Sequence, residues 1–181
     1  MKMILRFTPF IALTLVDRFA DWRWGVVAAL VTLAVVTVAM PPRRLGVLGG
    51  AMLAFFLGAG VLALTWPNQA VGNYLHACAA GWLSLVALAS IAVGRPFTID
   101  FAKEQVGPEV ARSSEFLAVN RRITLVWAAA FAAAAAAGVT SALLGRPLFG
   151  LAGTALSLLW AVKRTTETTS ATVGPATALT A

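Results

Sequence analysis

Long apolar runs without a single charged side chain dominate this sequence. Four of them, at residues 24–40, 46–66, 74–93 and 123–144, contain no Asp, Glu, Lys or Arg. A helix needs about 20 apolar residues to cross the hydrocarbon core of a bilayer, which is about 30 Å thick. Runs of this length and composition therefore predict membrane-spanning helices.

Two shorter apolar runs, at residues 3–16 and 148–162, flank this set. The first has no small-x-small cleavage site behind it, so we expect it to remain in the mature protein as a short span or half of a re-entrant hairpin. We predict an all-α fold, a polytopic membrane helix bundle with five to six hydrophobic segments, in one transmembrane domain over residues 1–164. The Thr/Ala-rich tail, residues 165–181, lacks periodic apolar residues and is predicted to be disordered.

The composition agrees with a membrane protein. Only 12% of the residues are charged and 60% are hydrophobic, and the mean hydropathy is +0.85. A soluble domain carries about 25% charged residues. The formal net charge of +7 does not indicate nucleic-acid binding, because the basic residues lie at the ends of apolar runs and form no stripe with interleaved aromatic residues. The partners implied by composition are membrane lipids, and no nucleic acid.

Residues 95–122 form a polar connector between two apolar runs, and nine charged residues of both signs lie in it. From Thr98 to Val106, apolar side chains recur on one helical face, which predicts a short amphipathic helix at the membrane surface. A second helix is expected to begin near Glu109 or Ser114 and to continue into the next span. The connector is either a solvated link or a partner-binding surface, for which the candidate residues are Ile99, Phe101, Val106 and Phe116.

The basic residues also predict the orientation of the spans. With the N-terminus inside the cell, eleven Lys and Arg residues fall on the inner side, and three, Arg18, Arg23 and Arg146, fall outside. Lys and Arg are enriched in the cytoplasmic loops of membrane proteins. We therefore expect the connector and the C-terminus to be cytoplasmic.

Small residues predict where helices approach each other closely. One stripe with a spacing of four residues contains Gly46, Gly50, Ala54 and Gly58. Such stripes allow close contact between helix backbones. We expect packing inside the protein here, and a homo-oligomer interface is the alternative. In the alanine-rich run at 123–144, which suits a helix buried among neighbours, Trp127 and Phe131 are further candidate helix-packing residues.

No metal, cofactor or catalytic site is predicted. His76 and Cys78 lie two residues apart, whereas a zinc site requires three or four ligands. We interpret His76 as an interfacial or packing residue. Two pairs of carboxylates four residues apart, Asp17 with Asp21 and Asp100 with Glu104, have the composition of a catalytic pair, but salt-bridged surface helices show the same pattern.

Four short motifs resemble the intracellular septation protein A family of small bacterial inner-membrane proteins. They are Arg6-Phe7-Thr8-Pro9-Phe10, the charged and aromatic joint from Asp17 to Trp24, Gly94-Arg95-Pro96, and Trp127-Ala128 with Phe131. The family has an Asn three residues before that Trp where this chain has Thr124, and its connector is shorter. The resemblance implies about five hydrophobic segments and a link to cell-envelope and division complexes. It implies no catalytic residues.

Three functions are compatible with these observations. The first is a non-enzymatic scaffold or accessory subunit of an envelope complex, whose partner is another membrane protein. The second is a small transporter for an apolar or amphipathic solute, which would require a polar cavity lined by Thr65, Ser84, Ser90 and Thr140. The third is a lipid-modifying enzyme in which carboxylates of the connector converge in one cleft.

Overall fold

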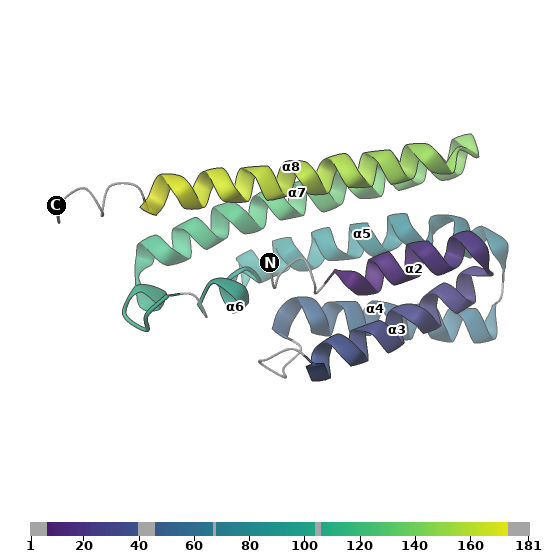
Figure 1. The fold of residues 1–181 in the computed structure, drawn as a ribbon, viewed down its shortest axis with the longest axis horizontal. Coiled ribbons are helices and arrows are strands. Elements are labelled where there is room, and N and C mark those ends of the chain that lie inside the picture. Colours follow the sequence, from purple (N-terminus) through teal and green to yellow (C-terminus); the bar gives the residue numbers. More distant parts are fainter. Residues whose placement is uncertain (1–6, 40–45, 67, 104–105, 174–181) are drawn as a thin grey trace.

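The computed structural model describes residues 7–39, 46–66, 68–103 and 106–173. Within these ranges all regular structure is helical, which confirms the predicted all-α class (Figure 1). The elements are α2 (Thr8–Phe19), α3 (Trp22–Ala39), α4 (Gly46–Thr65), α5 (Gln69–Ala92), α6 (Ile99–Ala102), the 3-10 helix η1 (Val110–Arg112), α7 (Ser114–Leu144) and α8 (Pro147–Val173).

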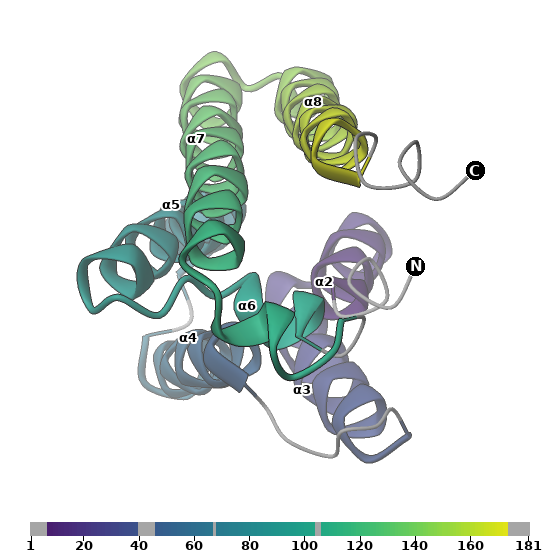
Figure 2. The same cartoon turned by 90° about the vertical axis from the view of Figure 1, so that its left-hand side faces the viewer.

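The bundle consists of six helices: α2, α3, α4, α5, α7 and α8. They run up and down it, and each packs against its neighbour in the sequence. We call the end where α5 finishes and α7 begins the connector end. The joint between α2 and α3 and the turns between α4 and α5 and between α7 and α8 lie at the opposite end (Figure 1). Viewed from the connector end, α6 lies in front of the ends of the long helices (Figure 2).

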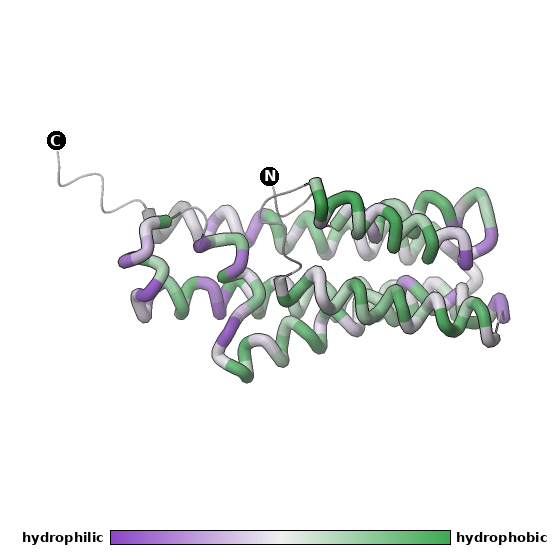
Figure 3. Tube along the Cα trace, turned by 90° about the horizontal axis from the view of Figure 1, so that it is seen from below, coloured by the Kyte–Doolittle hydropathy of each residue, from purple (hydrophilic) through white to green (hydrophobic). Residues whose placement is uncertain are grey.

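Four helices, α3, α4, α5 and α7, are long and apolar enough to cross a membrane. Hydrophobic residues cover the length of the bundle, and hydrophilic residues gather towards its two ends (Figure 3). Two of the six predicted segments are too short in their apolar part to count as such spans. Helix α2 has 12 residues, or about 18 Å at 1.5 Å per residue, and the apolar part of α8 ends at Lys163. The fold is therefore compatible with an integral membrane protein that has four spans.

The short helix α2 and the residue before it, Phe7, complete the core. Leu13 is fully buried. The Phe7 ring stacks on Trp127 of α7 with the ring centroids 5.4 Å apart, and Phe10 meets Phe56 of α4 at the same centroid distance. Trp127 and Phe131 are both buried in this cluster and contact each other's rings.

The glycine stripe of α4 does not pack inside the protein, and that prediction is wrong. Gly46, Ala54 and Gly58 are exposed, and Gly50 is half-buried. A Cβ atom added at Gly50 or Gly58 would meet no atom within 4 Å. Helix α4 instead buries an adjacent face that carries the larger side chains Leu48, Met52 and Phe56. The reason is that burying large apolar groups in the aromatic core outweighs close backbone approach at the stripe.

Other glycines make the close contacts. A Cβ atom at Gly138 of α7 would lie 2.9 Å from the Cβ atom of Ala77 in α5, and one at Gly153 of α8 would clash with the Cβ atom of Ala137. The same position at Gly72 is 2.6 Å from the Trp22 ring. Helix α7 thus lies between α5 and α8, which confirms that its alanines serve close helix packing.

Two helix boundaries differ from the sequence prediction. Helix α5 begins at Gln69 rather than 74, because the Asn68 side chain caps it by accepting a hydrogen bond from the Ala70 N–H. Helix α8 continues through residues 165–173, so the predicted disorder is wrong there, and residues 174–181 lie outside the described ranges. Thr165 and Thr169 donate hydrogen bonds to carbonyls one turn back, and Glu167 pairs with Arg164, which supports the helix locally.

Candidate functional site at the connector end

The first part of the connector is anchored in the bundle by Phe97. This side chain is 1% exposed and belongs to the main hydrophobic cluster. Its backbone N–H donates a hydrogen bond to Ser90 Oγ in α5, with the atoms 3.2 Å apart. The sequence pattern does not indicate Phe97 as an anchor, because Phe97 lies just before the predicted amphipathic helix from Thr98 to Val106.

Next to this anchor, three buried polar residues join the connector to α7. The Thr98 hydroxyl lies 3.0 Å from the Asn120 carbonyl oxygen, to which it donates, and 2.9 Å from the Thr124 hydroxyl. All three residues are at most 4% exposed. Because the single Thr98 proton goes to the Asn120 carbonyl, Thr124 must donate to Thr98. The cluster therefore has a defined direction of hydrogen bonding.

Asn120 is held by its own helix. Its side-chain amide donates to the Phe116 carbonyl at 2.9 Å, which identifies the nitrogen, because the opposite flip would place two acceptors together. The other atom, Oδ1, is buried and has no hydrogen-bond partner in the part of the chain that is described. The interface between the connector and α7 is thus polar, and nearly but not fully satisfied.

A second contact ties the connector to the opposite side of the bundle. Asp100 Oδ2 accepts a hydrogen bond from the Val47 N–H, 3.2 Å away, at the first turn of α4. A carboxylate is favourable there because the first N–H groups of a helix lack partners within it and carry partial positive charge. Asp100 also pairs with Lys103 at 2.9 Å. The connector therefore bridges α7 and α4 across the end of the bundle.

The predicted amphipathic helix over residues 98–106 is reduced to the single turn α6, Ile99–Ala102. Residues 104 and 105 lie outside the described ranges, and Val106 is in a bend. The helix is short because Phe97 and Thr98 are buried, which leaves α6 as one turn above them. The four candidate partner-binding residues, Ile99, Phe101, Val106 and Phe116, are all half-buried, and Phe101 packs edge-on against Phe97.

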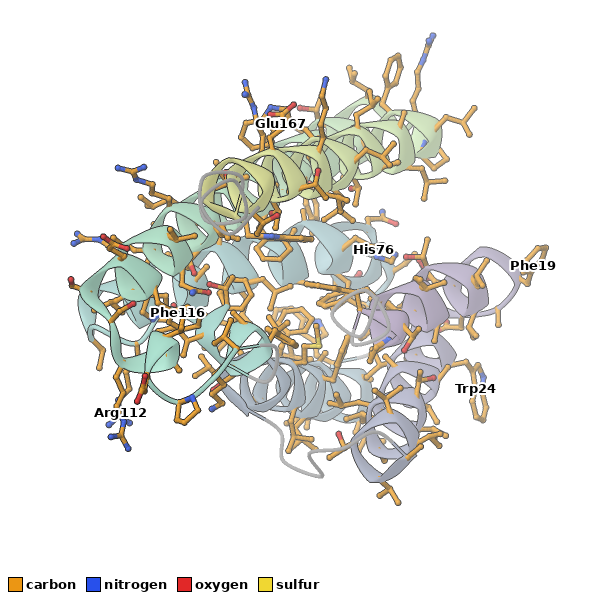
Figure 4. All side chains as sticks on the ribbon, turned by 60° about the vertical axis from the view of Figure 1, so that its left-hand side comes forward. Phe19, Trp24, His76, Arg112, Phe116 and Glu167 are labelled. Carbon is orange, nitrogen blue, oxygen red and sulfur yellow. The ribbon has the colours of Figure 1, made fainter. Side chains whose placement is uncertain are left out.

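The second predicted helix is confirmed in position and continuity. Helix α7 begins at Ser114 and runs unbroken to Leu144. The Ser113 side chain caps it by accepting a hydrogen bond from the Phe116 N–H at 3.1 Å. Phe116 lies in the first turn of α7, near α6 (Figure 4). The 3-10 helix η1 comes just before α7, and its Arg112 side chain points away from the bundle.

Sequence reasoning also missed a polar contact near the opposite end. His76 Nε2 of α5 lies 3.1 Å from Asp17 Oδ2 of α2. Phe19 and Trp24 point outward from α2 and α3 (Figure 4). His76 therefore joins two helices, which agrees with its interpretation as a packing residue. No sequence signal pairs it with Asp17, because Asp17 lies in a joint with several charged residues, 59 positions away.

The four hydroxyl residues that the transporter alternative requires do not line one polar site. Of the connector carboxylates that the enzyme alternative requires, Asp100 contacts α4 and Lys103, and Glu104 lies outside the described ranges. Ser84 and Ser90 are buried and donate hydrogen bonds to carbonyls of α7 and α5, respectively, whereas Thr65 and Thr140 are exposed. Asp17 contacts His76, while Asp21 accepts hydrogen bonds from Arg23, which lower the pKa of the Asp21 carboxyl. Among the described residues, no group of three His, Cys, Asp or Glu side chains could hold a metal ion.

Replacing either hydroxyl of the Thr98–Thr124 pair is expected to destabilise the protein. Thr98→Val and Thr124→Val should each lower the free energy of unfolding by about 1–3 kcal/mol, because a buried polar group loses its partner. The double variant should cost less than the sum of the two. Thermal unfolding in detergent measures this, with the exposed Thr65→Val as control. Strictly additive effects would contradict the pairing.

The bundle and its bridged end define the class of this protein as an all-helical protein with four helices able to span a membrane. Comparisons with known protein families, with characterised proteins and with solved structures find no match.

Proposed function

We propose that this protein is a non-enzymatic integral membrane protein, a scaffold or accessory subunit of a cell-envelope complex. The observation that carries the proposal is the docked connector. Buried Phe97, the Thr98–Thr124 cluster and the Asp100 contact with α4 hold it against the bundle. A polar segment held at three points presents a defined surface, whereas a plain link between two spans needs no such anchors.

The exposed part of this surface is the best candidate for contact with a partner. Val110 of η1 is 52% exposed and Leu117 of α7 is 42% exposed, and both precede the adjacent residues Arg121 and Arg122 in the sequence. Exposed apolar side chains rimmed by charged ones are typical of protein interaction sites. The four residues predicted from sequence are half-buried in the same connector region.

The connector end is proposed to be cytoplasmic. Nine basic side chains are described; seven of them lie at the connector end, and Arg23 and Arg146 lie at the opposite end. This distribution agrees with the enrichment of Lys and Arg on the cytoplasmic side. A bacterial inner membrane and a relationship to the septation protein A family remain part of the proposal, and the sequence motifs support them.

The orientation is tested by labelling single cysteines in a Cys78→Ser background. Glu109→Cys at the connector end should react only with reagents that enter the cytoplasm. Arg146→Cys at the opposite end should react with a membrane-impermeant reagent in intact cells. Both positions are exposed, so reactivity reports the side of the membrane. The reverse pattern would overturn the orientation.

The scaffold function is tested by affinity purification from native membranes in mild detergent, with mass spectrometry of the bound proteins. The double variant Val110→Asp/Leu117→Asp should reach the membrane in normal amount and lose the partner that the wild type retains. Arg146→Gln at the opposite end is the matched control and should retain it. If the double variant keeps the same partner, the exposed connector surface does not bind it.

A further inference from the structure

The basic side chains at the connector end fall into two groups. Lys103 pairs with Asp100, and both Lys163 and Arg164 pair with Glu167, at nitrogen–oxygen distances between 2.9 and 3.9 Å. The other group has no ion pair with any carboxylate among the described residues, and all of its members are exposed: Arg95, Arg112, Arg121 and Arg122. Among the described residues, this end of the bundle thus carries four arginines that no carboxylate neutralises through an ion pair.

The fold brings these four arginines to one part of the surface. The Ser84 hydroxyl bonds to the Ala128 carbonyl, which sets the antiparallel register of α5 and α7. Counting seven residues from that contact in opposite directions brings Ile91 level with Arg121. Helix α5 ends at Ala92, and the Arg95 N–H donates a hydrogen bond to the Ser90 carbonyl, so Arg95 lies just past that end of α5. The contact of Thr98 with Asn120 and Thr124 keeps the start of the connector against α7.

Arg112 lies on the same side of the bundle end, because η1 packs against α7 and Ser113 caps that helix. From Ser113 to Arg122 the helix rises by about 14 Å at 1.5 Å per residue. The Arg112 side chain points away from the bundle (Figure 4). The arginines therefore occupy a band about 14 Å deep. The headgroup layer of one leaflet is roughly 5–8 Å thick, so Arg112, at the outer end of the band, reaches that layer only through its long side chain.

The position of Arg121 and Arg122 along α7 agrees with a headgroup location. The apolar part of α7 begins directly after Arg122, and Leu125, less than one turn further, is 46% exposed on the outer surface of the bundle. In a bilayer this side chain faces the lipid tails. The guanidinium groups of Arg121 and Arg122 then lie at the level of the lipid phosphates.

We propose that Arg95, Arg112, Arg121 and Arg122 form a binding site for the phosphate groups of anionic phospholipids. A guanidinium group presents two parallel N–H donors that match two phosphate oxygens, and it stays charged at all physiological pH values. Basic residues between membrane helices at the cytoplasmic surface recognise anionic headgroups in this way. The site rests on the membrane location proposed above and requires no protein partner.

An anionic lipid surface fits these arginines better than an acidic protein segment does. The four arginines lie just after α5, in η1 and near the start of α7, and a headgroup layer is continuous around this end of the bundle. The connector surface, by contrast, carries carboxylates of its own, including Asp100, Glu109 and Glu115, which would repel an acidic segment.

The site is tested with the full-length protein in nanodiscs of phosphatidylcholine, with or without phosphatidylglycerol. Phosphatidylglycerol should raise the melting temperature of the wild type, and most of that rise should be lost in the fourfold Arg→Gln variant. Arg121→Gln/Arg122→Gln alone should lose about half of it. Lys163→Gln/Arg164→Gln, which removes two cations that are already paired, should keep the full rise.

Each contrary result has a separate meaning. An equal rise in the fourfold variant, or no rise in the wild type, would overturn the lipid site and leave the scaffold proposal intact. A rise produced equally by free inorganic phosphate in neutral nanodiscs would assign the arginines to soluble anions and would also overturn it. Failure of the wild type to incorporate into either nanodisc would instead contradict the membrane location on which both proposals rest.

Discussion

Gly138→Leu is expected to destabilise the protein by about 3 kcal/mol or more, since insertion of extra volume into a packed core costs 1–3 kcal/mol and more where backbone must move. The added Cβ atom would lie 2.9 Å from the Cβ atom and 3.1 Å from the Cα atom of Ala77. The clash therefore involves the α5 backbone and not the end of a flexible side chain. For a chain of this size the melting temperature should fall by roughly 6–12 °C.

Gly58→Leu is the matched control for this prediction. It is the same substitution in the middle of a long helix, but no atom lies within 4 Å of the new Cβ atom. Leucine has a higher helix propensity than glycine by roughly 0.8 kcal/mol, so this variant should be as stable as the wild type or slightly more stable. Thermal unfolding of both proteins in one detergent makes the comparison. Equal losses would show that the α4 stripe also packs within the protein.

Phe97→Ala is expected to have the second large effect, because Phe97 is the apolar anchor of the connector. Truncation of a fully buried phenylalanine costs about 3–5 kcal/mol. Part of that cost should appear locally, as faster hydrogen exchange of the amides of residues 96–103, since the connector loses its contact with the core. The spans keep most of their contacts, so their amides should change much less.

The control for Phe97 is Leu117→Ala, on the same surface but 42% exposed. Surface substitutions of this kind usually change stability by no more than about 0.5 kcal/mol, so exchange of residues 96–103 should stay as in the wild type. If Phe97→Ala leaves exchange in that segment unchanged, the connector is held by its polar contacts alone, through Thr98 and Asp100.

Helical class and the approximate positions of the spans could be read from the sequence because they depend on local composition. An uncharged apolar run near 20 residues long has few alternatives to a helix in lipid, where every backbone polar group must be paired within the segment. The start of α7 was predicted near Glu109 or Ser114, and the structure places it at Ser114, where the Ser113 side chain caps the helix locally.

The choice of packing faces could not be predicted in the same way. Gly50 and Gly58 have the spacing of a packing stripe, and Gly138 and Gly153 do not stand out among many alanines, yet the second pair makes the close contacts. A helix that is apolar on all sides carries no pattern that distinguishes its lipid face from its protein face. The neighbouring helices make that distinction, through the fit of large side chains such as Phe56 into the core.

The candidate site shows the same division between local and distant information. The sequence alone determined that residues 95–122 are polar, lie between two spans and lead into a continuous helix. Only the tertiary structure decided that Phe97 and Thr98 are buried, that Asp100 caps α4, and that four arginines have no ion pair among the described residues. The contacts of Thr98 with α7 and of Asp100 with α4 join residues 22 and 53 positions apart in the chain. The physical reason is that hydrophobicity and helix capping act within one or two turns, whereas the burial and pairing of a polar group depend on which helices meet.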